Sequence, residues 1–251
     1  MNAERRVVLV TGAGRGIGRA TARLLGRQGA AVGVNYVRDL AAAQQTADEV
    51  ERAGGRALLL PGDVADETAV VALFDELETA FGPVDALVNN AGIVGPSMPL
   101  AEMDTARLRR MFDVNVLGAY LCAREAARRM STDRGGRGGA IVNVSSAASR
   151  LGSPNEYVDY AGSKAAVDTM TIGLAKELGP RGVRVNVVRP GLIETDIHAS
   201  GGQPQRAAVL GAQTPIGRAG QAEEVAQAIV WLLSDAASYV TGALLDVSGG
   251  R

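Results

Sequence analysis

The sequence predicts an α/β protein in which a seven-stranded parallel sheet carries helices on both faces. Short apolar segments alternate with helical patterns along the whole chain, as is typical of parallel strands joined by right-handed crossovers. The first apolar segment, Val7–Val10, leads directly into a glycine-rich turn and then into a helix. A length of 251 residues fits one doubly wound domain of the Rossmann type, spanning residues 1–251.

The composition argues against several classes of function. With 26 basic and 27 acidic residues the formal net charge is −1, so neither nucleic acid nor a membrane surface is expected as a partner. No apolar run is long enough to span a membrane, and a cytoplasmic location is predicted. Because the chain has one cysteine, Cys122, and one histidine, His198, we expect no disulfide, no metal site and no Ser-His-Asp triad.

The glycine-rich turn after the first strand has the features of a phosphate-binding site. Glycines stand at positions 12, 14, 16 and 18, between Thr11 and a helical pattern that continues to about Gln28. Bare backbone amides and the positive end of the helix dipole would face a bound anion. The strict G-x-G-x-x-G spacing fails because its third glycine would fall on Ile17, so a simple tight turn is the alternative.

The second strand, at 31–35, ends in residues that favour NADP(H) over NAD(H). A carboxylate at this place in dinucleotide-binding folds accepts a hydrogen bond from the ribose 2′-hydroxyl, whereas a basic residue accommodates a 2′-phosphate. Here the strand ends in the neutral Asn35, with Arg38 just beyond it and Arg15 in the glycine turn. The alternative is that both arginines are simply solvated, and Asp39 is close by.

The remaining elements continue the same alternation. Strands are predicted at 56–61, 84–88, 140–144, 183–188 and 243–247, and helices at about 39–53, 67–81, 103–130, 160–178 and 223–234. After the third strand, Asp63-Val64 places a carboxylate where it can meet an adenine amino group, or where it only caps the loop. The fourth strand ends in Asn89-Asn90-Ala91-Gly92, at the sheet edge where ligands bind in such folds.

Two irregular places stand out in the second half of the chain. Asn115 lies inside the predicted helix at 103–130, where an asparagine diverts backbone hydrogen bonds and predicts a kink and a water site. The stretch at about 192–213 has little periodicity and is predicted to form a loop with a short helix over a substrate. This loop contains Thr195 and His198, and His198 either contacts a substrate or faces solvent.

Tyr160 and Lys164 are four residues apart in a predicted helix, so their side chains project from one face. A phenol is a poor acid or base near neutrality because its ordinary pKa is about 10. Lowering that pKa by about three units requires roughly 4 kcal/mol of preferential interaction with the phenolate, which a nearby cation can supply. The alternative is an ordinary pair on a solvated helix.

Taken together, these motifs resemble the classical short-chain dehydrogenase/reductase family over essentially the whole chain. The matching features are Thr11-Gly12-x-x-x-Gly16-x-Gly18, Asn89-Asn90-Ala91-Gly92, Asn115, Ser146, Tyr160-x-x-x-Lys164, and Pro190-Gly191 with Thr195. The resemblance implies an NAD(P)-binding fold. The residues expected to hold the dinucleotide are Thr11, Gly12, Gly14, Arg15, Gly16, Ile17, Gly18, Asn35, Arg38, Asp63, Val64, Asn90, Ala91, Gly92, Tyr160, Lys164, Pro190, Gly191, Ile193 and Thr195.

The resemblance also implies a role for each catalytic residue. Tyr160 would be the general acid or base, and Ser146 would hydrogen-bond the reacting oxygen. Lys164 would lower the pKa of Tyr160 and bind the nicotinamide ribose, and Asn115 would hold a water that relays protons to Lys164. The cofactor itself would carry the hydride.

The spacing of the serine departs from the commonest family pattern. That pattern puts the serine thirteen residues before the tyrosine, which would be Ala147, whereas Ser146 lies fourteen residues before Tyr160. The segment 149–159 is therefore expected to hold one extra residue. Ser145 is a competing choice of serine, and Tyr157 is a competing tyrosine with alanine four residues after it.

The sequence thus predicts an NADP(H)-dependent oxidoreductase, with NAD possible, that acts on a small carbonyl or secondary alcohol. The alternatives are a glucose-type sugar 1-dehydrogenase, a reductase of 3-oxoacyl thioesters on an acyl carrier protein, and a non-catalytic cofactor-binding regulator. The carrier-protein alternative would use surface cations at Arg128, Arg129 and Arg181. Small residues along the helix at 160–178 permit close contact between subunits, and a homotetramer is expected.

Overall fold

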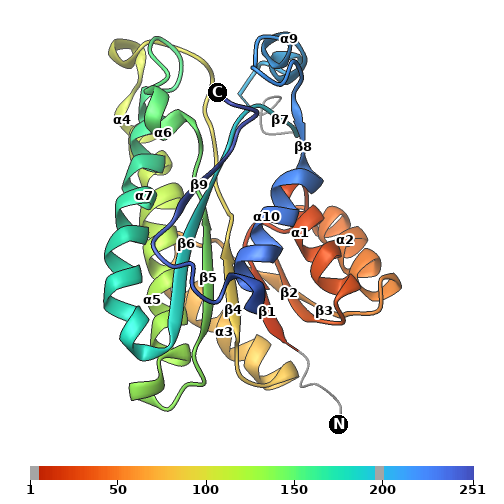
Figure 1. Ribbon diagram of the computed structural model, residues 1–251. Coiled ribbons are helices and arrows are strands. Elements are labelled where there is room, and N and C mark those ends of the chain that lie inside the picture. Colours follow the sequence, from red (N-terminus) through yellow and green to blue (C-terminus); the bar gives the residue numbers. More distant parts are fainter. Residues whose placement is uncertain (1–5, 196–200) are drawn as a thin grey trace.

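The computed structural model describes residues 6–195 and 201–251, and it confirms the predicted fold class. Seven parallel strands form one sheet in the order β3-β2-β1-β4-β5-β6-β9 (Figure 1). Their bounds are Val7–Val10 for β1, Ala31–Tyr36 for β2, Arg56–Pro61 for β3, Ala86–Asn89 for β4, Gly139–Val144 for β5, Val183–Pro190 for β6 and Leu244–Val247 for β9. The strand order reverses between β1 and β4, so the crevice at the carboxyl ends of these strands is the expected ligand site.

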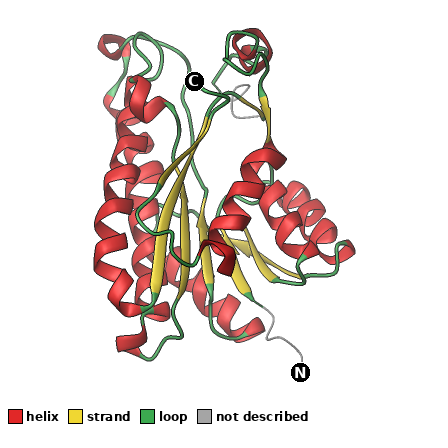
Figure 2. Cartoon of the chain, viewed as in Figure 1, coloured by secondary structure: helices red, strands yellow, loops and turns green. Residues whose placement is uncertain are grey.

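Helices cover both faces of the sheet (Figure 2). One face carries α1 (Gly16–Arg27), α2 (Leu40–Arg52) and α10 (Ala222–Leu233), and the other carries α3 (Glu67–Phe81), α5 (Gly118–Met130) and α7 (Val158–Leu178). Alternate residues of β1 supply the two cores: Val8 and Val10 pack on the first face, and Val7 and Leu9 on the second. Burial on both faces explains the unbroken apolar segment in the sequence.

The predicted helix at 103–130 is interrupted. It consists of α4 (Thr105–Phe112), a π-helical turn labelled η2 (Asp113–Leu117) and α5. Asn115 is at the centre of this turn, and its buried amide bonds to the loop after β4 instead of facing solvent. The expected kink is therefore a π-helical turn, a feature often found at functional sites.

Short elements lie at the carboxyl edge of the sheet: α6 (Ala148–Leu151), the two-residue strands β7 (Ile193–Glu194) and β8 (Gly220–Gln221), α9 (Arg206–Gly211) and the 3₁₀ turn η1 (Leu100–Glu102). The 3₁₀ turns η3 (Thr132–Arg134), η4 (Gly179–Arg181) and η5 (Asp235–Ala237) instead precede β5, β6 and β9, at the opposite edge. The β7–β8 pair was not predicted, whereas α9 is the short helix expected between 192 and 214. Within the described residues, no helix has the length and apolar character that a membrane span requires.

Candidate active site

The glycine-rich turn between β1 and α1 has a backbone that requires glycine at several positions. Gly12 and Gly16 have φ angles of 61° and 54°, in the left-handed region that side chains disfavour. A β-carbon on Gly18 would lie 2.5 Å from the carbonyl oxygen of Gly12 and 2.6 Å from Nδ2 of Asn90. The turn therefore packs too tightly for any side chain at Gly18, and it leads directly into the N-terminus of α1.

Three polar side chains hold this turn in shape. The Asn90 amide donates to the carbonyl oxygens of Thr11 (2.8 Å) and Gly12 (3.1 Å). The Thr11 hydroxyl accepts from the backbone N–H of Asn90 and of Ala91, both at 2.9 Å. Asn35 accepts from the N–H of Gly12 at 3.1 Å and is itself buried. These side chains, expected at the cofactor, already have protein partners, so they hold the turn in shape.

The charged residues predicted to lie near the adenosine end of the cofactor differ in exposure and in hydrogen-bond partners. Arg15 and Arg38 are exposed, and Asp39 caps α2 by accepting from the N–H of Ala42 at 2.9 Å. Asp63 accepts from the N–H of Ala65 at 3.0 Å and from Arg110 at 2.7 Å, so it has the role in the loop that the sequence offered as an alternative, while Asp66 caps α3. The adjacent Val64 side chain is buried.

Tyr160 and Lys164 lie one turn apart near the start of α7. Lys164 Nζ is 5.7 Å from the centroid of the Tyr160 ring and donates to the carbonyl oxygen of Val144 at 2.8 Å. The lysine is almost fully buried, so its ammonium has little water around it. The pair is thus fixed against the carboxyl end of β5.

Burial moves the pKa values of both residues towards their neutral forms. It raises the pKa of the Tyr160 phenol above 10.0, while a hydrogen bond with the Ser146 side chain lowers it to a smaller extent. Burial also lowers the pKa of Lys164 to about 8, while the charge of Asp168 acts in the opposite direction. The expected lowering by Lys164 is not among the effects that act on the pKa of Tyr160 in this structure, where burial dominates, so near neutrality the phenol carries its proton.

The two candidate serines make different contacts. Ser145 is buried and donates its hydroxyl to the carbonyl oxygen of Lys164 at 3.0 Å, which ties the end of β5 to α7. The Ser146 hydroxyl accepts from the N–H of Ala148 at 3.1 Å, and the Ser146 side chain acts to lower the pKa of the Tyr160 phenol. The geometry therefore favours Ser146 as the residue that meets a reacting oxygen.

The segment between Ser146 and Tyr160 contains a strained turn. Ser153 and Asn155 have φ angles of 46° and 61°, and among the described residues other than glycine they alone have positive φ. Gly152 ends α6 in the same left-handed region, with φ 75°. Three left-handed residues within four positions fold the chain compactly here.

Asn115 connects the loop after β4 to the helix that carries Tyr160. Its Oδ1 accepts from the N–H of Ile93 at 2.8 Å, and its Nδ2 donates to the Ile93 carbonyl at 2.9 Å and to Ser163 Oγ at 3.1 Å. The Ser163 hydroxyl in turn donates to the carbonyl oxygen of Tyr160 at 2.7 Å. A β-carbon on Gly92 would lie 3.2 Å from Lys164 Nζ and 3.4 Å from Asn115 Oδ1, so only glycine leaves this space open.

Sequence reasoning missed a buried polar network beneath the site. Asn89 donates to Oδ1 of Asn143 at 3.1 Å, and Asn143 donates to the hydroxyl of Thr171 at 2.9 Å. Asn89 and Asn143 are paired in register on β4 and β5, while Thr171 is on α7. Two asparagines inside apolar strands are the signal that could have revealed it, because buried amides need partners.

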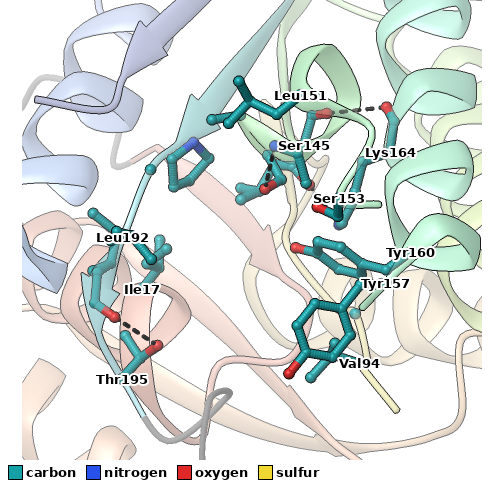
Figure 3. A pocket seen from close by; sticks show the side chains of 18 of the residues that line it. Ile17, Val94, Ser145, Leu151, Ser153, Tyr157, Tyr160, Lys164, Leu192 and Thr195 are labelled. Carbon is teal, nitrogen blue, oxygen red and sulfur yellow. Dashed lines mark hydrogen bonds between the residues drawn. The ribbon is translucent and has the colours of Figure 1, made fainter. Parts of the chain in front are cut away.

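A cleft of about 1030 Å³, counted out to bulk solvent, brings these residues together. Figure 3 shows Tyr157 and Tyr160 on one wall and Ile17, Leu192 and Thr195 on the other. The predicted residues that line it are Ile17, Asn90, Gly92, Ser146, Tyr160, Lys164, Pro190, Gly191, Ile193 and Thr195. Arg15, Arg38, Asp63 and Val64 are not among the lining residues, and His198 falls outside the described residues.

Cys122 and the metal-binding residue types take no part in this site. The Cys122 side chain is fully buried, and burial raises the pKa of its thiol to about 12, so it packs as a small apolar residue, as predicted. Residues 6–195 and 201–251 contain no group of three His, Cys, Asp or Glu side chains positioned to hold a metal ion.

A glycine turn at the strand-order reversal, opening into a cleft lined by Ser146, Tyr160 and a buried lysine, defines a dinucleotide-binding oxidoreductase. The family model described as "Enoyl-(Acyl carrier protein) reductase" matches residues 12–251. The chain belongs to the short-chain dehydrogenase/reductase family.

Curated relatives match along almost the whole chain. "Uncharacterized oxidoreductase YgfF" of Escherichia coli is 54% identical over 98% of this chain and 99% of its own. "Cis-4-hydroxycyclohexanecarboxylate dehydrogenase" of Sinomonas cyclohexanicum is 45% identical over 98% and 96%. "L-rhamnose 1-dehydrogenase (NAD(P)(+))" of a Sphingomonas species is 42% identical, also over 98% and 96%.

A solved structure supports the same family and fold. A short-chain dehydrogenase from Burkholderia cenocepacia, in complex with NADP, superimposes with a TM-score of 0.88. It is 33% identical to this chain, and the alignment covers 99% of each chain.

Proposed function

We propose that this protein transfers a hydride between NADP(H) and a small carbonyl compound or secondary alcohol, with Tyr160 as the general acid or base. The observation that carries the proposal is the placement of the Ser146 and Tyr160 hydroxyls in one cleft, with Tyr160 one helical turn from the buried Lys164. A substrate oxygen between these two hydroxyls would meet two donors at once.

The protein's part in reduction follows from this geometry. NADPH supplies the hydride that reduces the carbonyl carbon. Tyr160, protonated near neutrality because burial raises its pKa, gives its proton to the carbonyl oxygen. Ser146 stabilises the negative charge that develops on that oxygen. Lys164 then lies close enough to stabilise the phenolate until a proton returns, and oxidation of an alcohol is the reverse sequence.

The preference for NADP(H) rests on the charges beside the adenosine end of the site. Arg15 and Arg38 are exposed, and the side chain of Asp39 is engaged in capping α2. The neutral Asn35 lies near the end of β2 in place of a carboxylate that would accept from a ribose 2′-hydroxyl, and the two guanidinium groups suit a 2′-phosphate. The Burkholderia relative was solved with NADP, whereas the rhamnose dehydrogenase is named for both cofactors.

Two substrate classes are supported by names of relatives. The Sinomonas relative is named for a ring alcohol that also carries a carboxylate, and the Sphingomonas relative for a sugar. The cleft walls include Val94, Leu151 and Leu192, which favours an apolar ring over a fully hydroxylated one. We therefore place ring alcohols and ketones first, and a sugar 1-dehydrogenase second.

An acyl carrier protein as partner receives little support from the surface. Each arginine considered for that contact is paired within its own chain: Arg128 with Glu125 at 2.8 Å, Arg129 with Glu78 at 2.7 Å, and Arg181 with Asp133 at 3.0 Å. An acidic partner would have to compete with these internal pairs.

The proposed function is tested by steady-state assays in both directions, followed by NADPH absorbance, with ring ketones and alcohols, rhamnose, glucose and acetoacetyl thioesters. We expect turnover of a ring substrate, and a 10²- to 10⁴-fold loss of kcat in Tyr160→Phe with NADPH binding retained. Tyr157→Phe is the matched control and should keep kcat within a few-fold. Binding of NADPH without oxidation across the panel would instead support a non-catalytic regulator.

We also propose that the chain forms a homotetramer. Phe112, Leu117 and Tyr120, around the junction of the π-helical turn and α5, are between 44% and 47% exposed, as is typical of surfaces that contact another subunit. Light scattering should give four times the mass of one chain. Tyr120→Glu should lower that mass by placing a charge in the contact, and a monomeric wild type would contradict the proposal.

A further inference from the structure

The cleft that contains Tyr160 is lined by cations without matching carboxylates. Its described lining residues include Lys164, Arg206 and Arg251, and none of them is an aspartate or glutamate. Lys164 is deeply buried beside Tyr160 and belongs to the reaction centre. The two arginines therefore determine the charge of the rest of the cleft.

Arg206 is already neutralised by a partner. Its guanidinium donates to both carboxylate oxygens of Glu156, at 2.7 and 2.6 Å, and also to Gln203 at 2.7 Å. The group also stacks 5.2 Å from the centroid of the Tyr157 ring. A bidentate, stacked guanidinium of this kind is a structural pair that joins α9 to the turn before α7.

The backbone of Arg251 is held by hydrogen bonds, whereas its side chain is not held by any to the described residues. Its main-chain oxygen accepts from Arg150 at 2.6 Å and from the Ser248 hydroxyl at 2.9 Å. Within the described part of the chain its guanidinium makes no hydrogen bond or ion pair. Its charge helps to lower the pKa of Glu156, after the larger effect of the Arg206 hydrogen bonds. The Glu156 carboxylate thus lies near the guanidinium groups of both Arg206 and Arg251, so these three side chains together carry one net positive charge.

We propose that the Arg251 guanidinium binds the carboxylate of an anionic substrate whose carbonyl or hydroxyl carbon lies at Ser146 and Tyr160. The proposal rests on the proposed function and adds a substrate class to it: oxo or hydroxy acids in which an apolar spacer separates the two groups. Leu151 and Val94 supply apolar walls for such a spacer. Figure 1 shows the C-terminal end of the described chain at the same end of the molecule as α6 and α9.

The physical argument is one of charge balance in a partly dehydrated cleft. A carboxylate loses hydration when it enters the cleft, and a preorganised guanidinium with free donors compensates for that loss. A neutral ester of the same shape gains nothing from the cation. The energy of a hydrogen bond to a charged group corresponds to a preference of about 10- to 100-fold for the acid over its ester.

The test compares 4-oxocyclohexanecarboxylate with its methyl ester and with 4-methylcyclohexanone, as kcat/KM at saturating NADPH. We expect the wild type to prefer the acid by about 10- to 100-fold. Arg251→Gln should remove that preference by raising KM for the acid, while leaving the ester and the KM of NADPH unchanged. Arg251→Lys should restore part of it, and Arg27→Gln, an equal charge change on the exposed end of α1, should have no effect.

The outcomes separate this proposal from the proposed function. Turnover of the ketone and the ester without preference for the acid overturns the role of Arg251 and leaves the oxidoreductase intact. A rise in the KM of NADPH in Arg251→Gln would show that the guanidinium binds the cofactor instead. That result would also overturn the proposal that Arg251 binds the substrate carboxylate. If no compound is turned over, calorimetric titration of the acid into the protein–NADP⁺ complex decides: binding by the wild type that weakens at least tenfold in Arg251→Gln supports the proposal, and equal binding rejects it.

Discussion

Arg107 donates to both carboxylate oxygens of Asp159, at 2.8 and 3.3 Å, and Asp159 stands immediately before Tyr160. The same carboxylate accepts from the backbone N–H of Tyr160 at 2.8 Å, and Arg107 also donates to the carbonyl oxygen of Pro96 at 2.6 Å. Because the Asp159 side chain is fully buried, this ion pair anchors the first turn of α7 to the loop that follows β4.

Breaking this pair is expected to cost both stability and activity. Asp159→Asn leaves the Arg107 guanidinium without its buried counter-ion, so we expect a loss of about 3 kcal/mol in the free energy of unfolding. We also expect a lower kcat, because the N–H of Tyr160 loses a charged acceptor. Urea denaturation and NADPH oxidation measure the two effects.

Asp133→Asn is the control for that experiment, because it breaks an ion pair, with Arg181, in which both side chains are exposed. A change of less than about 1 kcal/mol is expected there. Equal stabilities for the Asp159 and Asp133 variants would show that the buried pair does not anchor the helix.

Replacing Ser146 should affect mainly activity, whereas replacing Ser145 should affect mainly stability. Ser146→Ala should lower kcat by about 10²- to 10³-fold with little change in melting temperature, because its hydroxyl faces Tyr160. Ser145→Ala should instead keep most activity and lower the melting temperature by about 2–4 °C, since it loses a buried hydrogen bond of about 1 kcal/mol to Lys164. The reverse pattern would identify Ser145 as the catalytic serine.

The buried lysine should make stability depend on pH. The pKa of Lys164 is about 8 in the folded chain and 10.5 ordinarily, so between these values the unfolded chain binds more protons and stability rises with pH. Between pH 7.5 and 9.5 this rise amounts to about 2 kcal/mol. Lys164→Met should lack it in urea denaturation curves of the protein without cofactor. Parallel curves for the two proteins would contradict the assigned pKa.

The cofactor preference should depend on the two exposed arginines. Arg15→Ala and Arg38→Ala should each raise the KM of NADPH about tenfold and leave the KM of NADH unchanged, because only the 2′-phosphate distinguishes the two cofactors. Arg52→Ala, at the far end of α2, is the control and should change neither value. Equal efficiency with NADH and NADPH, unaffected by these variants, would overturn the NADP(H) assignment.

The parts of the fold that depend on neighbours in sequence could be predicted. The apolar segment of β1, the glycine turn and α1 are contiguous, so pattern and turn chemistry are sufficient. The Tyr160–Lys164 spacing also belongs to a single helix. The catalytic roles of Asn115 and Ser146 stay predictions that the hydrogen bonds around them support.

What could not be predicted depends on contacts between distant residues. Asn89 and Asn143 meet only because β4 and β5 pair in one particular register, 54 residues apart. Arg206 meets Glu156 across 50 residues, and Arg251 reaches the cleft from the last residue of the sequence given. The π-helical turn at Asn115 requires the Ile93 backbone as its partner, and no local pattern contains that information.

The left-handed turn at Ser153 and Asn155 also determines how this protein can vary. The backbone around Ser146 is held against β6 by Ser145 and Ala147, and Tyr160 is held by Asp159 in α7, so the sheet and the helix fix both ends of the connection. Insertions and substitutions in that connection would alter the shape of the cleft without moving the reacting groups. Substrate scope can therefore diverge here by changes of length, while the chemistry is inherited unchanged.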